Sequence, residues 1–215
     1  MSATVGDIHF KRGESRLFET IWLLIHLTDS MAMAGLAVRG KLDLSQEKQG
    51  MCITCGSFSL EMILPIVQPT QLTVANRMID HIILEIRAKG TTPIPGEHNI
   101  TQYARLHNGL AGMPYLRFYE QHRPHIQKVH GGDTKAWPQT LQFAWLLRNG
   151  ITHHGGHINF ENPNYPAVTW NGLSFSPADN GKPIFAAHFT TADLIFLMRD
   201  VANHLDSIGA PFPVD

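Results

Sequence analysis

Four residues with chemically active side chains lie within seven positions in the C-terminal half of the chain: Arg148, Asn149, His153 and His154. A guanidinium is always charged, and its forked geometry matches phosphate oxygens. Imidazole has an unperturbed pKa close enough to neutrality to give and take protons at working pH. These residue types, so closely spaced, predict a site for metal-free phosphodiester chemistry.

The segment that carries these residues has the pattern of the end of a buried helix. At about 100° per residue, Asn149 and His153 share one helix face, Arg148 lies one step aside, and His154 is rotated further. The glycines at 155–156 place the histidines in or just past the last turn, where the helix dipole favours an imidazolium. We expect a carboxylate, a partner subunit or a bound phosphate to satisfy the charge of Arg148. The same residues would also suit a basic C-terminal cap without catalysis, and the sequence leaves both readings open.

The spacing Arg-Asn-x3-His at the end of an apolar helix resembles the HEPN superfamily. The resemblance implies a homodimer that cleaves single-stranded RNA without a metal or other cofactor, in a defence, stress or toxin-like role. It makes His153 the acid or base, with His154 the alternative because the motif spacing varies. It gives Arg148 the role of stabilising the transition state and Asn149 that of orienting the phosphate. It also implies an antitoxin or other regulatory protein as a possible partner.

Two other functions remain open beside the ribonuclease. In a non-catalytic HEPN-like module, Arg148 and His153 would hold a dimer interface or bind a nucleotide or RNA. In a zinc-dependent hydrolase, the cluster His153, His154 and His157 would bind the metal with His188 or Glu161. The glycines within the cluster and the missing His-Glu-x-x-His pattern argue against zinc, so we expect no metal site.

A basic segment precedes the predicted motif helix and provides candidate RNA-binding residues. Its cations Arg117, Arg123, Lys128 and Lys135 alternate with histidines and aromatic residues, an arrangement that can track a single-stranded backbone and stack bases. A solvated helix face whose aromatic residues belong to the core is the alternative.

The two cysteines, Cys52 and Cys55, are too few for a disulfide framework and suit a reducing compartment. Buried structural thiols are expected there, because no second cysteine pair completes a metal site. The sequence also lacks a glycine-rich phosphate loop, a Gly-x-Ser-x-Gly motif and paired acidic residues for a two-metal nuclease.

The composition is that of an ordinary globular protein. The 215 residues fit one domain, 1–215, and include 17 basic and 18 acidic residues, so any RNA contact must be local. The 13 histidines would make the protein cationic at lower pH. The early residues lack an apolar signal core and the longest early apolar run, 21–27, is too short for a bilayer, so a cytoplasmic protein without membrane contact is expected.

Apolar spacing and turn residues predict a mainly α-helical, HEPN-like bundle with a small antiparallel β insertion at about 158–189, between the last two helices. Asn171-Gly172 is the strongest hairpin signal, and Asp179-Asn180-Gly181 suggests a second turn before a strand at 184–189. A last helix should follow Thr190 or Thr191 as N-cap. The earlier helices are expected at 14–38, 48–66, 70–89, 101–107, 114–129 and 133–156.

Overall fold

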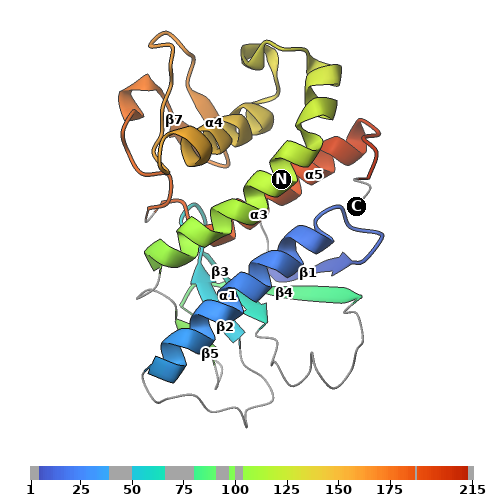
Figure 1. Ribbon diagram of the computed structural model, residues 1–215, viewed down its shortest axis with the longest axis vertical. Coiled ribbons are helices and arrows are strands. Elements are labelled where there is room, and N and C mark those ends of the chain that lie inside the picture. Colours follow the sequence, from blue (N-terminus) through green and yellow to red (C-terminus); the bar gives the residue numbers. More distant parts are fainter. Residues whose placement is uncertain are drawn as a thin grey trace.

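The computed structural model describes residues 5–38, 50–65, 80–90, 97–99, 104–186 and 188–212. Within these ranges the protein is a mixed α/β structure with a sheet and helix α1 at one end, helix α4 and a β-hairpin at the other, and helix α3 running between them (Figure 1). Helix α5 lies beside α3 between the two ends (Figure 1).

The sheet has five strands in the order β1-β4-β3-β2-β5. All neighbours pair antiparallel except β2 and β5, which are parallel. Alternate residues Ile82, Leu84 and Ile86 of β4 are buried, whereas Ile83 is 44% exposed, so this strand has one core face and one outer face. The strands are β1 Gly6–Lys11, β2 Gly50–Thr54, β3 Leu60–Pro65, β4 His81–Ala88 and β5 Glu97–Asn99.

Helix α1, Phe18–Val38, lies across the sheet and packs against α3 (Figure 1). Ile21, Leu24, Ile25 and Thr28 recur at helical spacing and are all buried, which gives the apolar stripe that the sequence predicted here. This helix confirms the first predicted element.

Helix α3, Ala104–His130, is a single long helix, although two helices were predicted over 101–107 and 114–129. It continues through Pro114 and Pro124, each of which removes a backbone donor. The buried Tyr115, Phe118 and Ile126 provide the packing that offsets this loss.

The predicted helix over 133–156 is divided in two. A short 3₁₀ helix, η2 Thr134–Ala136, begins at Asp133, whose side chain accepts the Lys135 N–H at 3.1 Å. Pro138 then serves as N-cap of α4, Gln139–His153. Proline at the start of α4 explains the break, because it cannot continue the preceding turn.

The hairpin lies where Asn171-Gly172 predicted it. Strands β6 Val168–Trp170 and β7 Leu173–Phe175 pair antiparallel, and both turn residues have positive φ, +54° and +82°, as a type I′ turn requires. The predicted third strand is wrong, because the described residues of 184–189 form an isolated bridge, between Ala186 and Phe189, and no strand. A short 3₁₀ helix, η3 Pro177–Asp179, lies between β7 and this bridge.

Helix α5, Thr191–Ser207, confirms the last predicted helix, with Thr190 as its N-cap. Asp193 completes a capping box with Thr190. The residues of its expected apolar stripe are all buried: Leu194, Leu197, Met198, Val201 and Leu205.

The expectation of a mainly helical bundle with a β insertion is wrong, because residues 50–65 and 81–88 form three central strands in place of the predicted helices. In β3, Met62, Ile63 and Leu64 are all buried, so the sequence shows an apolar run without the alternation typical of a strand. Residues 70–79 of the predicted third helix lie outside the described residues. Among the described helices, none is long and apolar enough to cross a membrane.

Candidate functional site

Arg148 is the centre of a polar cluster at the end of α4. Its Nη1 donates to the Asn149 Oδ1 at 3.0 Å and lies 3.0 Å from the His153 Nε2. Its Nε donates to the Glu120 Oε1 on α3 at 2.5 Å. The structure thus brings together three of the four residues that the sequence singled out and adds the carboxylate expected beside the arginine.

The contact with Arg148 determines which form of His153 fits. A guanidinium nitrogen only donates, so the His153 Nε2 must present its lone pair and the ring proton must be on Nδ1. A neutral imidazole is the form that acts as a base, and its Nε2 lone pair becomes available when a ligand displaces the contact with Arg148. His153 is exposed, whereas only 14% of the Arg148 side chain is. The arginine is therefore held in place and the histidine is open to a ligand.

His154 points into a different set of contacts. The Asn159 amide nitrogen lies 2.9 Å from the His154 Nε2, and the rings of His153 and His154 are 6.3 Å apart at an angle of 74°. Among the described residues, His154 contacts Asn159 whereas His153 contacts Arg148, so the two rings have different environments.

The chain turns sharply after α4 and fixes the end of the helix. The Gly150 carbonyl accepts the N–H groups of both His154, at 3.2 Å, and Gly156, at 2.9 Å. Gly155 and Gly156 have φ of +59° and +83°, conformations that favour glycine. This turn holds the histidines at the C-terminal end of the helix, as predicted.

Gly150 allows this turn to pack closely on the helix. A Cβ at position 150 would lie 2.6 Å from the His157 carbonyl oxygen and 2.5 Å from the Ile184 Cδ1. Both distances are shorter than van der Waals contact, so the glycine between Asn149 and His153 is required by packing.

Two buried tyrosines lie on α3 close to α4. The Tyr115 hydroxyl donates to the Ala144 carbonyl, and Tyr115 and Tyr119 are both buried. Burial raises the pKa of both phenols, while the charges of Arg123 and Arg148 partly lower that of Tyr119. Both phenols are therefore neutral, and Tyr115 ties α3 to α4 through its hydrogen bond, whereas the buried Tyr119 hydroxyl has no hydrogen-bond partner among the described residues. The residue after Tyr119 on α3 is Glu120, which contacts Arg148.

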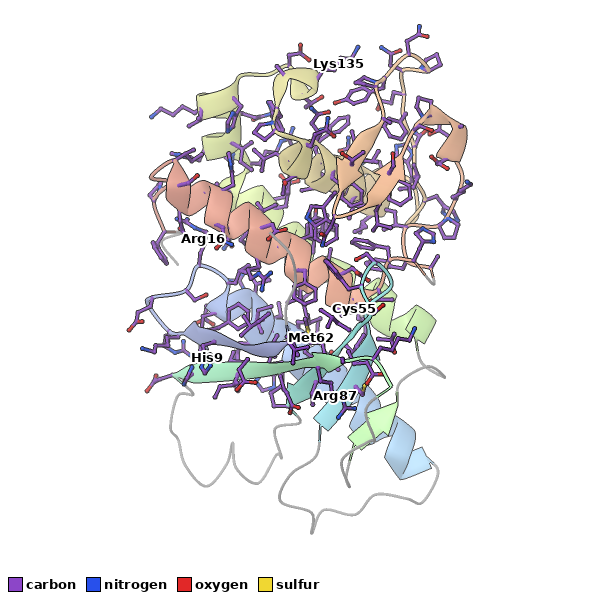
Figure 2. All side chains as sticks on the ribbon, turned by 180° about the vertical axis from the view of Figure 1, so that it is seen from behind. His9, Arg16, Cys55, Met62, Arg87 and Lys135 are labelled. Carbon is purple, nitrogen blue, oxygen red and sulfur yellow. The ribbon has the colours of Figure 1, made fainter. Side chains whose placement is uncertain are left out.

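The four predicted RNA-binding cations do not form one patch. Arg123 pairs with Glu120 at 3.5 Å, next to the Arg148 cluster. Lys135 lies over the Tyr165 ring at 5.5 Å and is at the opposite end of the molecule from His9 (Figure 2). Arg117 and Lys128 are exposed, and their spacing of 11 residues places them on the same side of α3, some 16 Å apart at 1.5 Å rise per residue.

The structure also bears on the zinc alternative and on the two cysteines. Among the described residues there is no group of three or more His, Cys, Asp or Glu side chains able to hold a metal ion, so the zinc alternative gains no support from them. His157 contacts the His154 carbonyl through Nδ1 at 3.1 Å. Cys52 and Cys55 are buried, reduced thiols, and burial followed by the charge of Asp193 raises the pKa of Cys55.

Sequence reasoning missed Glu120 and Asn159 as members of the site. Glu120 lies 28 residues before Arg148, and no local spacing pairs the two. Asn159 follows the glycine turn, which folds it back onto His154. A search for carboxylates within the basic segment would have offered two candidates, Glu120 and Asp133.

Comparison with known proteins assigns no family: no family model, no curated protein and no solved structure matches the chain. The HEPN resemblance accordingly depends on the motif residues themselves.

Proposed function

We propose that the Arg148–Asn149–His153 cluster cleaves single-stranded RNA without a metal, in a HEPN-like manner. The observation that carries the proposal is that one nitrogen, the Arg148 Nη1, lies 3.0 Å from both the Asn149 Oδ1 and the His153 Nε2. A phosphate that displaced Asn149 and His153 from the Arg148 Nη1 would lie within reach of a guanidinium, an amide and an imidazole together.

The reaction requires one base, one acid and a stabiliser of phosphate charge. His153 Nε2 takes the proton of the RNA 2′-hydroxyl as the 2′-oxygen bonds to phosphorus. The bond from phosphorus to the 5′-oxygen breaks, and that oxygen takes its electron pair and a proton from an acid. Arg148 stabilises the charge on the phosphate oxygens and Asn149 orients them. The products are a 2′,3′-cyclic phosphate and a 5′-hydroxyl.

A second copy of the chain supplies the acid in this proposal. Within one chain His153 alone contacts Arg148 among the described histidines, and its contact fits the neutral form. A two-fold pairing around the end of α4 would bring a second, protonated His153 to the leaving oxygen. The defence or toxin-like role, with a regulatory partner, extends this proposal from the family resemblance alone.

The test is incubation of mixed-sequence single-stranded RNA with the protein in EDTA, followed by analysis of product lengths and 3′ ends. We expect wild type to leave cyclic phosphate ends and Arg148→Ala and His153→Ala to lose this activity. His188→Ala, which changes an exposed histidine outside the cluster, should cleave as wild type does. RNA methylated at the 2′-oxygen should resist cleavage. Absence of cleavage by the pure wild-type dimer would reject the proposal.

One contact favours a second candidate, a non-catalytic module that binds RNA or a partner chain. Glu120 already neutralises Arg148 through its Nε, which suits a structural ion pair as well as a catalytic one. RNA binding without turnover, weakened by Arg148→Ala, would identify this function. Cleavage enhanced in Glu120→Gln would instead indicate that Glu120 restrains an active arginine.

A further inference from the structure

A second region of the molecule has a cavity that no catalytic residue lines. Its volume is about 300 Å³, and it lies where the loop after β1, the start of α1, the middle of α3 and the C-terminal segment meet. The lining includes Arg12, Ser15, Arg16, Arg117, Gln121 and Phe212. A cavity of this size is at the lower end of those that bind small molecules.

The cavity is rich in positive charge. Among its described lining residues, three are arginines and one, Glu19, is a carboxylate. Arg12 contacts Glu19 through Nη1, and its Nε lies 3.8 Å from the Asp80 Oδ1. The Asp80 side chain is 82% exposed, so water screens its charge. Arg16 is already paired with Asp206 outside the lining, so Arg12 and Arg117 are the cations that an anionic ligand would meet.

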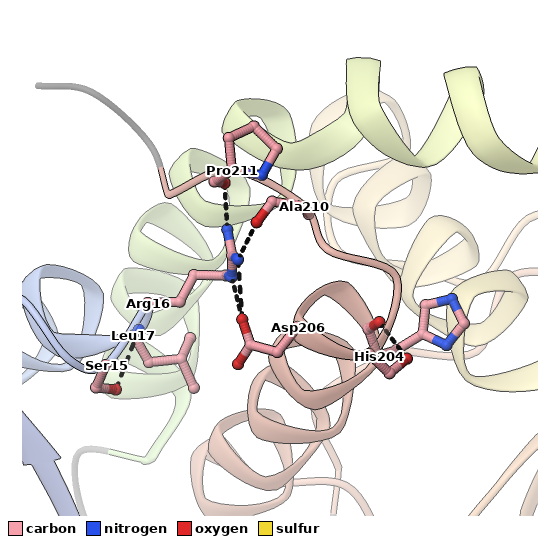
Figure 3. A network of polar contacts seen from close by, with 8 residues as sticks. Ser15, Arg16, Leu17, His204, Asp206, Ala210 and Pro211 are labelled. Carbon is pink, nitrogen blue, oxygen red and sulfur yellow. Dashed lines mark hydrogen bonds and ion pairs between the residues drawn. The ribbon is translucent and has the colours of Figure 1, made fainter.

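Arg16 supplies fixed charge on one side of the cavity. Its guanidinium donates to the Asp206 Oδ1 at 2.8 Å and to the carbonyls of Ala210 at 2.7 Å and Pro211 at 2.5 Å (Figure 3). Only 1% of this side chain is exposed. These contacts hold the C-terminal segment against α1, and they place Phe212, with its ring 4.6 Å from the Arg16 guanidinium carbon, at the cavity.

Helix α3 provides the opposite side. Arg117 and Gln121 are four residues apart and therefore lie one above the other on one face. Both are exposed as well as lining the cavity, so a ligand can reach them from solvent. The Gln121 amide and the Ser15 hydroxyl add neutral hydrogen-bonding groups that suit a sugar or phosphate ester.

We propose that this cavity binds a small phosphate ester of nucleotide size, with its phosphate between Arg12 and Arg117 and its planar part on Phe212. A guanidinium pairs with phosphate through two parallel hydrogen bonds. The Phe212 side chain is an exposed large hydrophobic residue, 46% exposed, and it offers a ring face to a base. The ligand would compete with Glu19 for Arg12.

This inference is independent of the proposed ribonuclease. Arg148 and His153 do not line the cavity. Failure of RNA cleavage would leave the cavity's ligand binding unaffected, and failure of binding would leave cleavage unaffected.

The experiment is isothermal titration calorimetry of the full chain with adenosine 5′-monophosphate, with adenosine as the control that lacks the phosphate. We expect the monophosphate to bind with a Kd below about 1 mM and adenosine at least about tenfold more weakly. Arg117→Gln should weaken monophosphate binding about tenfold, whereas Lys128→Gln, the same charge change on the same helix outside the cavity, should change it less than twofold.

A second pair of variants protects the test against misfolding. Gln121→Glu places a carboxylate at the cavity and should weaken binding about tenfold, and Gln127→Glu, exposed on the same helix outside the cavity, should not. The proposal is overturned if wild type shows no heat of binding up to about 10 mM, if adenosine binds as tightly as the monophosphate, or if each variant matches its control. Weakened RNA binding in Arg117→Gln, without any monophosphate binding, would assign the residue to RNA and also overturn it.

Discussion

Two polar networks of this protein differ in how far they are exposed to solvent. At the start of α5, Asp193 has no exposed surface and its carboxylate accepts the N–H groups of Gly56 at 2.7 Å, Ser57 at 3.0 Å and Thr190 at 2.8 Å. At the end of α4, the His153 of the Arg148 cluster is exposed. The first network is closed within the chain, and the second is open to a ligand.

The difference separates the groups that stabilise the fold from those that could act on a ligand. A buried carboxylate whose oxygens are satisfied by backbone donors stabilises the fold and has no group left for chemistry. The Asp193 network ties the β2–β3 turn to α5, elements that are far apart in the sequence. In the Arg148 cluster the partners Glu120 and His153 are exposed, so their contacts with the arginine contribute little stability and can be replaced by a ligand. We expect mutations in the Asp193 network to lower stability, and mutations in the Arg148 cluster to lower activity with little change in stability.

The largest expected effect is that of Asp193→Ala. The change leaves three backbone donors and the Ser57 hydroxyl without their acceptor, so the free energy of unfolding should fall by about 4 kcal/mol. Urea unfolding monitored by circular dichroism measures it. Asp193→Asn, which keeps one acceptor oxygen, should lose less. An Asp193→Ala protein as stable as wild type would remove the basis of the comparison.

A pH dependence of stability should come from His122 on the buried side of α3. Burial, followed by the charge of Arg16, lowers the pKa of His122 from about 6.5 to about 4. Between these values the unfolded chain binds a proton that the folded protein does not, so stability falls as pH falls from 6.5 to 4, by up to about 3 kcal/mol.

The measurement is the free energy of unfolding of wild type and His122→Gln over this pH range. The difference between the two proteins should shrink or reverse as the pH falls, because the variant lacks the titrating ring. Parallel curves for the two proteins would contradict the assignment to His122.

Gly150→Ala should have the next largest effect and should affect both stability and the site. The added Cβ lies 2.6 Å from the backbone oxygen of His157, so the turn after α4 must shift, at a cost of about 2 kcal/mol. Gly132→Ala, where a Cβ meets nothing within 4 Å, is the matched control and should be neutral. Thermal unfolding of both variants tests this, and equal stabilities would show that the turn is not tightly packed.

The smallest stability effect is expected for Arg148→Gln. Its ion pair with Glu120 involves a carboxylate side chain that is 42% exposed, so its loss should cost less than about 1 kcal/mol. Urea unfolding of this variant, beside Asp193→Ala, gives the comparison directly. A loss as large as that of Asp193→Ala would place Arg148 among the structural groups.

The motif helix and the last helix were predictable because their signals are local. Helix α5 combines a capping box with an apolar stripe, and the turn after α4 contains two glycines in conformations that favour glycine. The Asn171-Gly172 hairpin is equally local. These signals required no knowledge of distant residues.

The central sheet was not predictable in the same way. Strand β3 is buried on both faces, so its sequence lacks the alternation of apolar and polar residues that identifies a strand. In β4, the positions of Ile82, Ile83 and Ile86 also fit the spacing of a helix. The β-branched isoleucines of β4 were a signal for a strand that apolar spacing alone missed. Residues of the site that arrive from other elements, such as Glu120, and the arginines of the cavity at the start of α1, depend on tertiary packing and left no local pattern.

The most direct test of the account is the rate of RNA cleavage in EDTA by Arg148→Gln and His153→Gln, measured on samples whose free energies of unfolding are determined in parallel. We expect both variants to lose at least about a hundredfold in rate while stability stays within about 1 kcal/mol of wild type. Cleavage at the wild-type rate by either folded variant would contradict it.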